Sequence, residues 1–367
     1  MRIDRLEVYY VEIPMAYPWK TAYGADKVCH TVFVKAISGD FAGWSESSPF
    51  FAPTYTNESA GSVYYHVTEV FGPRIVGREY DTSGELNERL SIYKGNSFGK
   101  AAIEVAWWTL ESAITGIPLH LLLGGTTREV VTGTAIGIED SFDSLLHKLQ
   151  EAVDTGYPRI KLKVAPGWDV EMLEVVRSAF PDVTLHVDCN SAYTLDDLPM
   201  FRAIDKFNLA FIEQPLHFND IIDHALLAKQ IETPICLDES ITSSRVAEQA
   251  IRLNSCKYIN IKPWRTGGIS DSIKVHDMAR DAGIPVWLGG MVETGIAKSI
   301  SIELATLDNF TYPADLGNVS DMFEKDITDG FPDITARLTY EPFTGSLPVP
   351  NPDHLTEAVK VHKVVAP

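Results

Sequence analysis

The sequence has few cysteines and no long apolar run, and these two absences exclude several classes of protein. None of its four cysteines forms a CxxC pair. We therefore expect reduced, buried thiols and neither a zinc site nor disulfides. No run of about 18 apolar residues is present, so no membrane-spanning helix is predicted. The four thiols are Cys29, Cys189, Cys236 and Cys256.

Positive charge is also scarce, with 31 Lys and Arg against 50 Asp and Glu and a formal net charge of −19. Such a surface repels nucleic acid and anionic membranes, so neither is an expected partner. The N-terminus, MRIDRLEVYYVEIPM, alternates polar and apolar residues where a signal peptide would have an apolar core. We therefore predict a cytoplasmic protein. No GxGxxG or P-loop follows a predicted strand, which argues against a nucleotide-binding sheet.

The pattern of the chain changes near residue 128. Residues 1–127 mix β-like alternation with helical stretches, which is typical of an α+β domain. From 128 to 320, eight short β-branched runs alternate with amphipathic stretches in units of roughly 25 residues. This α/β alternation predicts a TIM-type (β/α) barrel. The runs begin near Val130, Arg159, Val183, Leu209, Pro234, Lys257, Ile284 and Phe310.

Three acidic residues end three consecutive barrel runs. Asp188 closes LHVD, and Glu213 and Asp238 follow at equal intervals of 25 residues. Taken alone, Asp188 is better explained as a helix cap or turn residue. The C-terminal strand ends of a barrel meet at one centre, however, and three converging carboxylates require a cation. Oxygen ligands indicate Mg²⁺ or Mn²⁺, and we expect Asn190 and Glu239 to orient them.

Lysines flank these acids on the neighbouring strands. In RIKLKV, Lys161 and Lys163 lie two residues apart, so both point to the same face of a strand. Adjacent ammonium groups should lower the pKa of at least one lysine, which suits a base near neutral pH. Lys262 ends the sixth run, YINIK, on the other side of the acids. Two lysines that flank a metal suit removal of a proton next to a carboxylate.

The barrel segments resemble the muconate lactonizing subgroup of the enolase superfamily. Within that subgroup they are similar to the o-succinylbenzoate synthase and N-succinylamino acid racemase family, over nearly the whole chain. This resemblance implies a modified barrel (128–320) with an α+β capping domain (1–127), against which residues 321–367 return to pack. It also implies a small carboxylate substrate and a homo-oligomer. The segments that carry it are RIKLKVAPGWD, FIEQPL, TPICLDES, NIKP and GIPVWLGGMVETGI.

The resemblance also implies the roles of the site residues. The three acids would bind Mg²⁺, Lys163 and Lys262 would form the acid–base pair, and Lys161 would tune Lys163. The implied chemistry removes a proton α to a carboxylate and stabilises an enediolate. We expect o-succinylbenzoate synthase, a dehydrating lyase of menaquinone synthesis, with N-succinylamino acid racemase as the alternative, which the retained Arg265 supports. A muconate-type cycloisomerase and a barrel that binds metal without catalysis are less favoured.

Substrate contacts are expected around this machinery. PWKTAYG (18–24) resembles a mobile capping loop, and Phe50 and Phe51 could close over an apolar substrate, although ordinary packing explains such aromatics equally well. Two positions depart from the family pattern. Trp264 stands where the family has glycine and could narrow the pocket, and Ala135 stands where serine is usual. The expected substrate-binding residues are Tyr55, Arg265, Gly289, Gly290, Met291 and Glu293.

Overall fold

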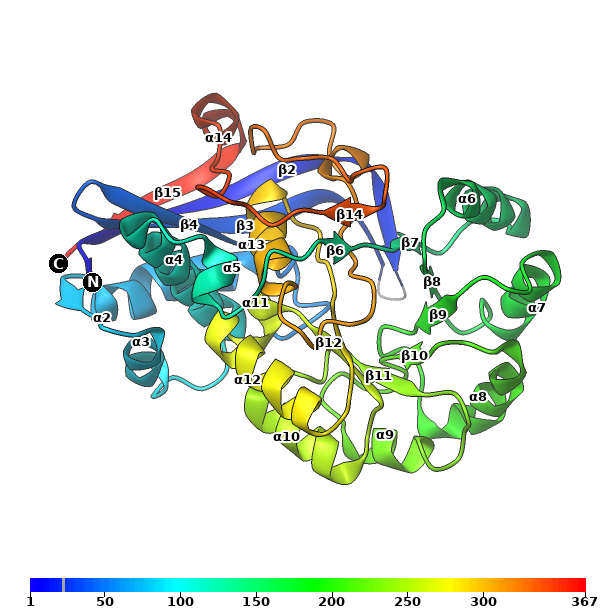
Figure 1. The fold of residues 1–367 in the computed structure, drawn as a ribbon. Coiled ribbons are helices and arrows are strands. Elements are labelled where there is room, and N and C mark those ends of the chain that lie inside the picture. The colour runs from blue at the N-terminus through cyan, green and yellow to red at the C-terminus, as the bar shows by residue number, and fades with distance from the viewer. Residues whose placement is uncertain (22–23) are drawn as a thin grey trace.

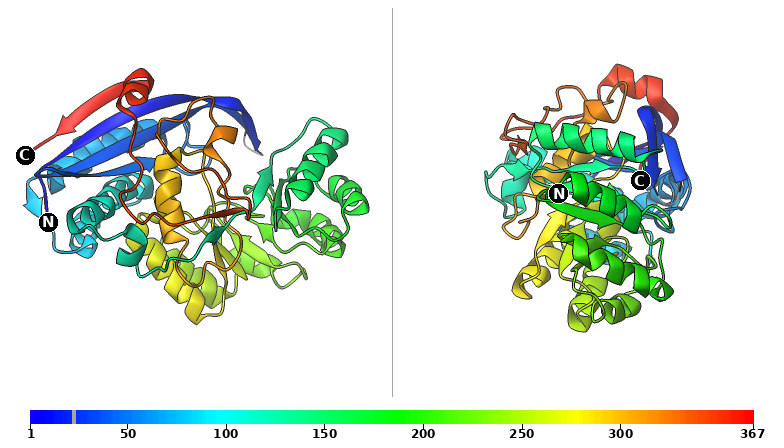
Figure 2. Two further views of the ribbon diagram at one scale, coloured as in Figure 1. Left: turned by 45° about the horizontal axis from the view of Figure 1, so that its top comes forward. Right: turned by 90° about the vertical axis from the view of Figure 1, so that its right-hand side faces the viewer.

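An antiparallel sheet of four strands forms one end of the molecule (Figure 1). The computed structural model describes residues 1–21 and 24–367, and the strand order in this sheet is β15-β2-β3-β4. The C-terminal strand thus pairs with β2, and both chain termini lie at the same end of the molecule (Figures 1 and 2). The strands are β2 (Arg5–Thr21), β3 (Gly24–Ser38), β4 (Phe41–Ser47) and β15 (Val359–Val365).

The helix α4 (Ser97–Thr115) packs closely against this sheet. A Cβ atom on Gly43 of β4 would lie 2.5 Å from the carbonyl oxygen of Ala106, so the close approach requires glycine. Gly116, with φ 68°, ends the helix in the left-handed conformation. The other elements of this part are β1 (Arg2–Ile3), α1 (Ala60–Tyr65), η1 (His66–Phe71), α2 (Gly72–Ile75), β5 (Arg78–Glu79), α3 (Ser83–Leu90) and α5 (Leu119–Leu122).

Seven parallel strands follow in chain order, from β7 to β13, and curl around a common centre (Figure 1). The predicted (β/α) barrel is confirmed, with one difference. The eighth run forms only isolated parallel bridges, from Phe310 to Val286 and from Ala314 to Thr132, because Pro313 has no amide hydrogen for a ladder. The strands are β7 (Thr134–Ile136), β8 (Ile160–Lys163), β9 (Leu185–Asp188), β10 (Ile212–Glu213), β11 (Ile235–Leu237), β12 (Tyr258–Ile261) and β13 (Val286–Leu288).

Helices connect the barrel strands, and their ends carry the expected caps. Ser141 and Ser243 accept hydrogen bonds from the first-turn amides of α6 and α10. The helices are α6 (Phe142–Thr155), α7 (Val170–Ala179), α8 (Leu198–Ile204), α9 (Ile222–Leu227), α10 (Ser244–Leu253), α11 (Pro263–Thr266), α12 (Ile269–Asp281) and α13 (Gly295–Leu304). The remaining elements are β6 (Val130–Val131), η2 (Leu195–Asp197), η3 (Asp205–Phe207), η4 (Val319–Asp321), β14 (Thr339–Tyr340) and α14 (Pro352–Ala358).

A buried arginine joins the two edges of the curled sheet. The guanidinium of Arg159 donates hydrogen bonds to the carbonyl oxygens of Thr134 (2.8 Å), Pro313 (3.2 Å) and Ala314 (2.6 Å). Gly133 leaves room for it, because a Cβ atom there would lie 2.3 Å from Nε of Arg159. The eighth run is therefore held to the first strand by a side chain where regular ladder bonds are missing.

Two buried glutamates fasten the N-terminal part of the chain to barrel helices. Glu46 accepts hydrogen bonds from the amides of Thr294 and Ala297 at the start of α13. Glu104 accepts from the amides of Ile269 and Ser270 at the start of α12. A helix N-terminus stabilises negative charge, so each carboxylate caps a helix of the other part. The predicted domain boundaries at residues 127 and 320 stay a prediction.

Two predictions about what the chain lacks can be compared with the structure. All four cysteines are buried and free, as expected. Within residues 1–21 and 24–367, no helix has the length and apolar character needed to cross a membrane.

Candidate active site

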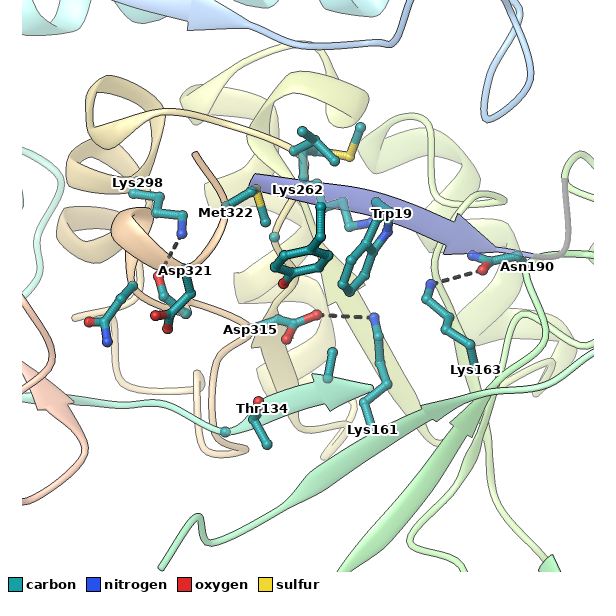
Figure 3. A pocket seen from close by; sticks show the side chains of 18 of the residues that line it. Trp19, Thr134, Lys161, Lys163, Asn190, Lys262, Lys298, Asp315, Asp321 and Met322 are labelled. Carbon is teal, nitrogen blue, oxygen red and sulfur yellow. Dashed lines mark hydrogen bonds and ion pairs between the residues drawn. The ribbon is translucent and has the colours of Figure 1, made fainter. Parts of the chain in front are cut away.

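A cavity of about 160 Å³ opens at the C-terminal ends of the barrel strands, and four lysines belong to its wall (Figure 3). Lys161 and Lys163 enter it from β8, and Lys262 enters from the end of β12. Their side chains are almost fully buried. The wall also includes Tyr17, Trp19, Phe50, Tyr55, Gly133, Thr134, Ala135, Tyr157, Asn190, Gly290, Met291, Val292, Lys298, Asp315, Gly317, Asn318, Asp321 and Met322.

The two lysines of β8 lie against the first predicted metal ligand. The Nζ atom of Lys163 lies 2.6 Å from Oδ2 of Asp188, and that of Lys161 lies 3.2 Å from the same oxygen. Burial lowers the pKa of Lys163. Burial alone would also lower the pKa of Lys161, but Asp315, Glu213 and Asp188 together raise it. One of the paired lysines thus has a lowered pKa, and the other is held charged.

Lys262 belongs to a second buried network on the other side. Its Nζ donates to Oδ2 of Asp238 at 2.9 Å and to the hydroxyl of Tyr55 at 3.0 Å. The Tyr55 hydroxyl donates to Oδ1 of Asp238, and Arg265 contacts both groups. Burial alone would lower the pKa of Lys262, but Tyr55, Glu213 and Glu239 raise it. Lys262 is therefore held as a cation.

Glu213 lies between these two networks. Its Oε1 accepts a hydrogen bond of 2.7 Å from the Asn260 amide. Its Oε2 is buried and accepts no hydrogen bond from the described part of the chain, although Nζ of Lys161 lies 3.4 Å away. Burial and the neighbouring Asp188 raise the pKa of Glu213. A buried carboxylate oxygen with no hydrogen bond is the donor that a hard cation would use.

The three predicted ligands fit a divalent cation in their chemistry but are not gathered around one point. Asp188, Glu213 and Asp238 are buried at the ends of three adjacent strands, and all offer oxygen atoms. Residues 1–21 and 24–367 contain no group of three His, Cys, Asp or Glu side chains arranged to hold a metal ion. Ammonium groups lie among the carboxylates and balance their charge.

Asn190 and Glu239 were predicted to orient the metal ligands, and Asn190 makes the direct contacts with the site. Its backbone amide donates to Oδ1 of Asp188, and its side-chain oxygen accepts from Nζ of Lys163 at 2.8 Å. Its Nδ2 donates to Oε1 of Glu239 at 3.1 Å. Asn190 has φ 43°, a left-handed conformation that asparagine tolerates well. Glu239 therefore reaches the ligand network through Asn190.

The side chain of Gln214 ties the ends of β10 and β11 together. Its Oε1 accepts hydrogen bonds from the amides of Asp238 (3.0 Å) and Ser240 (3.1 Å). Its Nε2 donates to the hydroxyl of Ser240 and to the carbonyl oxygen of Leu216. Gln214 directly follows Glu213 in the chain and bonds the amide of Asp238. The position of its side chain therefore links two of the three acids, Glu213 and Asp238.

Half of the expected substrate-binding residues reach the cavity wall. Tyr55, Gly290 and Met291 line it. Arg265, Gly289 and Glu293 lie behind it. The Arg265 guanidinium bonds Tyr55 and contacts Asp238, which holds it away from the cavity. Gly289 packs against Asn260, since a Cβ atom on Gly289 would lie 2.3 Å from the Asn260 side-chain amide.

The structure also shows where the predicted aromatic residues lie, together with the two positions that depart from the family pattern. Phe50 lines the cavity, whereas Phe51 is 64% exposed and packs on His30, so it does not close over the site. Trp264 is buried outside the cavity wall and donates through Nε1 to Glu293 at 3.3 Å, so it does not narrow the pocket. Ala135 lines the cavity. Of the expected capping loop, 22–23 lie outside the described residues.

Three charged residues of the wall, Asp315, Asp321 and Lys298, were not predicted from the sequence. Asp315 follows the eighth run, and its Oδ2 lies 3.1 Å from Nζ of Lys161. An acid after a strand run is the signal that identified Asp188, so the same rule applied to the eighth run would have found Asp315. Lys298 comes from the helix α13, where no strand-end signal exists.

Comparison with known proteins places this geometry in a family. The family described as "Enolase C-terminal domain-like" matches residues 144–341, and that described as "Mandelate racemase / muconate lactonizing enzyme, N-terminal domain" matches residues 5–124. Members of the enolase superfamily generally use Mg²⁺.

Individual relatives carry two different names. The chain is 39% identical over 329 residues to an N-succinylamino acid racemase of Thermus thermophilus, covering 90% of this chain and 89% of the racemase. It is 38% identical over 335 residues to an o-succinylbenzoate synthase of Bacillus subtilis, covering 91% and 90%. A solved enolase superfamily member from Listeria innocua superposes with a TM-score of 0.95 at 32% identity, covering 100% of this chain and 99% of that one. The chain therefore belongs to the enolase superfamily, with the N-terminal and C-terminal domains of its mandelate racemase and muconate lactonizing enzyme group.

Proposed function

We propose that the protein removes a proton α to a carboxylate, and that its reaction is that of an o-succinylbenzoate synthase. The observation that carries this proposal is the pair of buried lysines, Lys163 and Lys262, which reach into one cavity from different strands (Figure 3). The Nζ atom of each is paired with a carboxylate, that of Asp188 or of Asp238. A carbon between them would face a lysine side chain on either side.

The two lysines differ in the pKa of their ammonium groups, and this difference divides the roles. Burial lowers the pKa of Lys163, so this lysine gives up its proton more readily than Lys262, and as the free amine it is the base that takes the α-proton. The neighbouring carboxylates and Tyr55 keep Lys262 charged, so its ammonium stabilises the negative charge that builds on the substrate. Asp188 and Asn190 hold the Nζ atom of Lys163 in place during the transfer.

The dehydration needs only this one base. The α C–H bond breaks, and the proton moves to Nζ of Lys163. The ring hydroxyl of the cyclohexadiene substrate then leaves, and Lys163 returns the proton to it, so that water and the aromatic ring form. A single base and a fixed cation suffice for this sequence, which supports the synthase as the first assignment.

The carboxylates would hold a cation in the same site. We propose that Asp188, Glu213 and Asp238 bind Mg²⁺, with Mn²⁺ as a substitute, because their donor atoms are all oxygen. Bound Mg²⁺ would supply positive charge opposite the carboxylate of the substrate. Asn190 and Gln214 orient the acids through the hydrogen bonds described above.

The racemase remains the second candidate, because a relative of similar identity carries that name. Racemisation requires that Lys262 take or deliver a proton on the face opposite Lys163. Arg265, whose guanidinium contacts Asp238 beside Lys262, is the residue placed to adjust that exchange. We further propose a small carboxylate substrate for either reaction and an assembly of identical subunits.

Two parallel assays distinguish these functions. Purified protein with Mg²⁺ is given the hydroxy-cyclohexadiene precursor of o-succinylbenzoate, and separately one enantiomer of an N-succinylamino acid. Efficient dehydration supports the synthase, and racemisation without dehydration supports the racemase. Failure of both reactions, with the Lys163→Ala variant as the background control, would overturn the proposed function.

A further inference from the structure

A fourth lysine lies at the other end of the cavity from Lys163 (Figure 3). Lys298 extends from the second turn of α13 and is only 2% exposed. Its Nζ donates a hydrogen bond of 2.5 Å to the carbonyl oxygen of Gly317. The chemistry proposed above uses Lys163 and Lys262 and gives Lys298 no role.

The ammonium group of Lys298 has bonding capacity to spare. An ammonium has three N–H donors, and the Gly317 oxygen uses one of them. Among residues 1–21 and 24–367, no carboxylate oxygen lies within 4.0 Å of this Nζ. Burial lowers the pKa of Lys298 because a buried ammonium without a counter-charge is costly, so an anion that enters from the cavity would stabilise the ammonium and accept its remaining donors.

The nearest acidic groups do not replace such an anion. Glu293 and Asp326 lie beyond ion-pair distance from Nζ of Lys298, and burial raises the pKa of both, that of Glu293 to about 8. Asp321 also lines this end of the cavity, but it is exposed, and water screens its charge. The remaining acid of the wall, Asp315, is paired with Lys161.

We infer that Lys298 binds a second carboxylate of the substrate, at the end of the cavity away from the reacting carbon. The inference rests on the proposed function, because it assumes that the first carboxylate lies between Lys163 and Lys262. The substrate class is then a dicarboxylate with one acid at the reacting carbon and one on a short arm. The succinyl group common to o-succinylbenzoate and the N-succinylamino acids provides such an arm.

The alternative role for Lys298 is purely structural. Its bond to Gly317 ties α13 to the segment after the eighth run, so loss of the side chain could loosen the whole cavity wall. A structural role would affect all substrates equally. A binding role would affect only those with the second carboxylate.

The test compares two substrates that differ only in that carboxylate. The Lys298→Met variant and the unmodified enzyme, both with Mg²⁺, are assayed on N-succinyl and N-acetyl forms of the same amino acid. We expect kcat/KM for the N-succinyl substrate to fall about 10- to 100-fold, because a charged hydrogen bond is lost, with less than about twofold change for the N-acetyl substrate. Lys298→Arg should recover part of the loss. Lys148→Met, at an exposed lysine paired with Glu139, is the matched control.

A binding measurement keeps the inference testable if neither substrate reacts. In that case the proposed function fails, and calorimetric titration with succinate and with butyrate, its monocarboxylate counterpart, still examines Lys298. Tighter binding of succinate that disappears in Lys298→Met supports the subsite. Equal loss on both substrates, or succinate binding unchanged by the substitution, would overturn it.

Discussion

The Nζ atom of Lys163 lies 2.6 Å from Oδ2 of Asp188, so the proposed base and a proposed metal ligand form a buried ion pair. From the sequence, Lys163 was expected only on the strand next to that of Asp188. The contact means that Lys163 competes with any cation for this carboxylate oxygen. It also means that Asp188, a proposed Mg²⁺ ligand, positions the lysine.

Substitution of Lys163 should separate catalysis from metal binding. We expect Lys163→Ala to lower kcat at least 100-fold, because the base is removed. Mg²⁺ affinity should stay the same or rise, because Asp188 loses its competing ammonium. Steady-state kinetics and calorimetric Mg²⁺ titration measure the two effects, with the exposed Lys148→Ala as control. Full activity, or a marked loss of Mg²⁺ affinity, would refute these roles.

Removing the negative charge of Glu213 should weaken Mg²⁺ binding. Glu213→Gln keeps an oxygen that can accept the hydrogen bond from the Asn260 amide. It removes the negative charge of the carboxylate, whose Oε2 accepts no hydrogen bond from the described residues. We expect Mg²⁺ affinity to fall at least about tenfold. Glu174→Gln, at an exposed ion pair with Lys206, should leave the Mg²⁺ titration unchanged. An unchanged titration for Glu213→Gln would place the metal elsewhere.

Loss of the Gln214 side chain should reduce stability and disturb Asp238. Gln214→Leu leaves the buried amides of Asp238 and Ser240 without an acceptor. The expected decrease in the free energy of unfolding is about 1–3 kcal/mol, the cost of unsatisfied buried donors. Urea unfolding measures it. Gln150→Leu, at an exposed glutamine bonded to Asp154, should change stability little, and equal losses in both variants would contradict the assignment.

Gly289 should tolerate no side chain. A Cβ atom there would lie 2.3 Å from the Asn260 amide, which bonds Glu213, so Gly289→Ala must displace that amide. We expect weaker Mg²⁺ binding together with about 1–3 kcal/mol lower stability, as for other overpacked sites. Gly345→Ala has open space around its new Cβ atom and serves as the control. Normal Mg²⁺ binding by Gly289→Ala would show that Asn260 does not position Glu213.

A buried histidine away from the cavity should make stability depend on pH. The Nδ1 atom of His224 bonds the Asp220 carbonyl, and Nε2 accepts from the Leu216 amide, so the ring is held neutral. Burial lowers the pKa of His224 to about 4. The unfolded chain, with a pKa of about 6.5, therefore binds more protons between these two values, and stability falls as pH decreases through that range.

The size of this effect can be measured by subtraction. Between pH 7 and pH 5, the His224 ring should reduce the free energy of unfolding by about 2 kcal/mol. Unfolding of the protein and of His224→Gln at both pH values isolates this contribution. Equal pH dependence of the two proteins would show that His224 does not titrate as its hydrogen bonds require.

Strand-end periodicity was sufficient to predict the barrel and its central charged residues. Asp188, Glu213 and Asp238 each end a short buried run, and the pleat fixed Lys161 and Lys163 on one face. These are local regularities, which a sequence displays directly. The metal-binding and catalytic roles of these residues stay predictions.

Contacts between distant segments could not be predicted in this way. Lys298 is one polar residue within a helix, and its place at the cavity follows from how α13 packs. Glu46 bonds Thr294, which lies 248 residues further along the chain. Trp264 was expected to affect the pocket, but its ring is buried beside Glu293 because α11 begins at Pro263 and turns it from the cavity. Such outcomes depend on tertiary packing.

The central claim is that Lys163 removes a proton α to a carboxylate. The most direct test incubates each enantiomer of an N-succinylamino acid separately with the protein and Mg²⁺ in D₂O and follows the α-proton signal by NMR. We expect the unmodified protein to replace this proton with deuterium and Lys163→Ala to lose the exchange for one enantiomer. Undiminished exchange of both enantiomers in the variant, or an unmodified protein that neither exchanges this proton nor dehydrates the cyclohexadiene substrate, would contradict the role of Lys163.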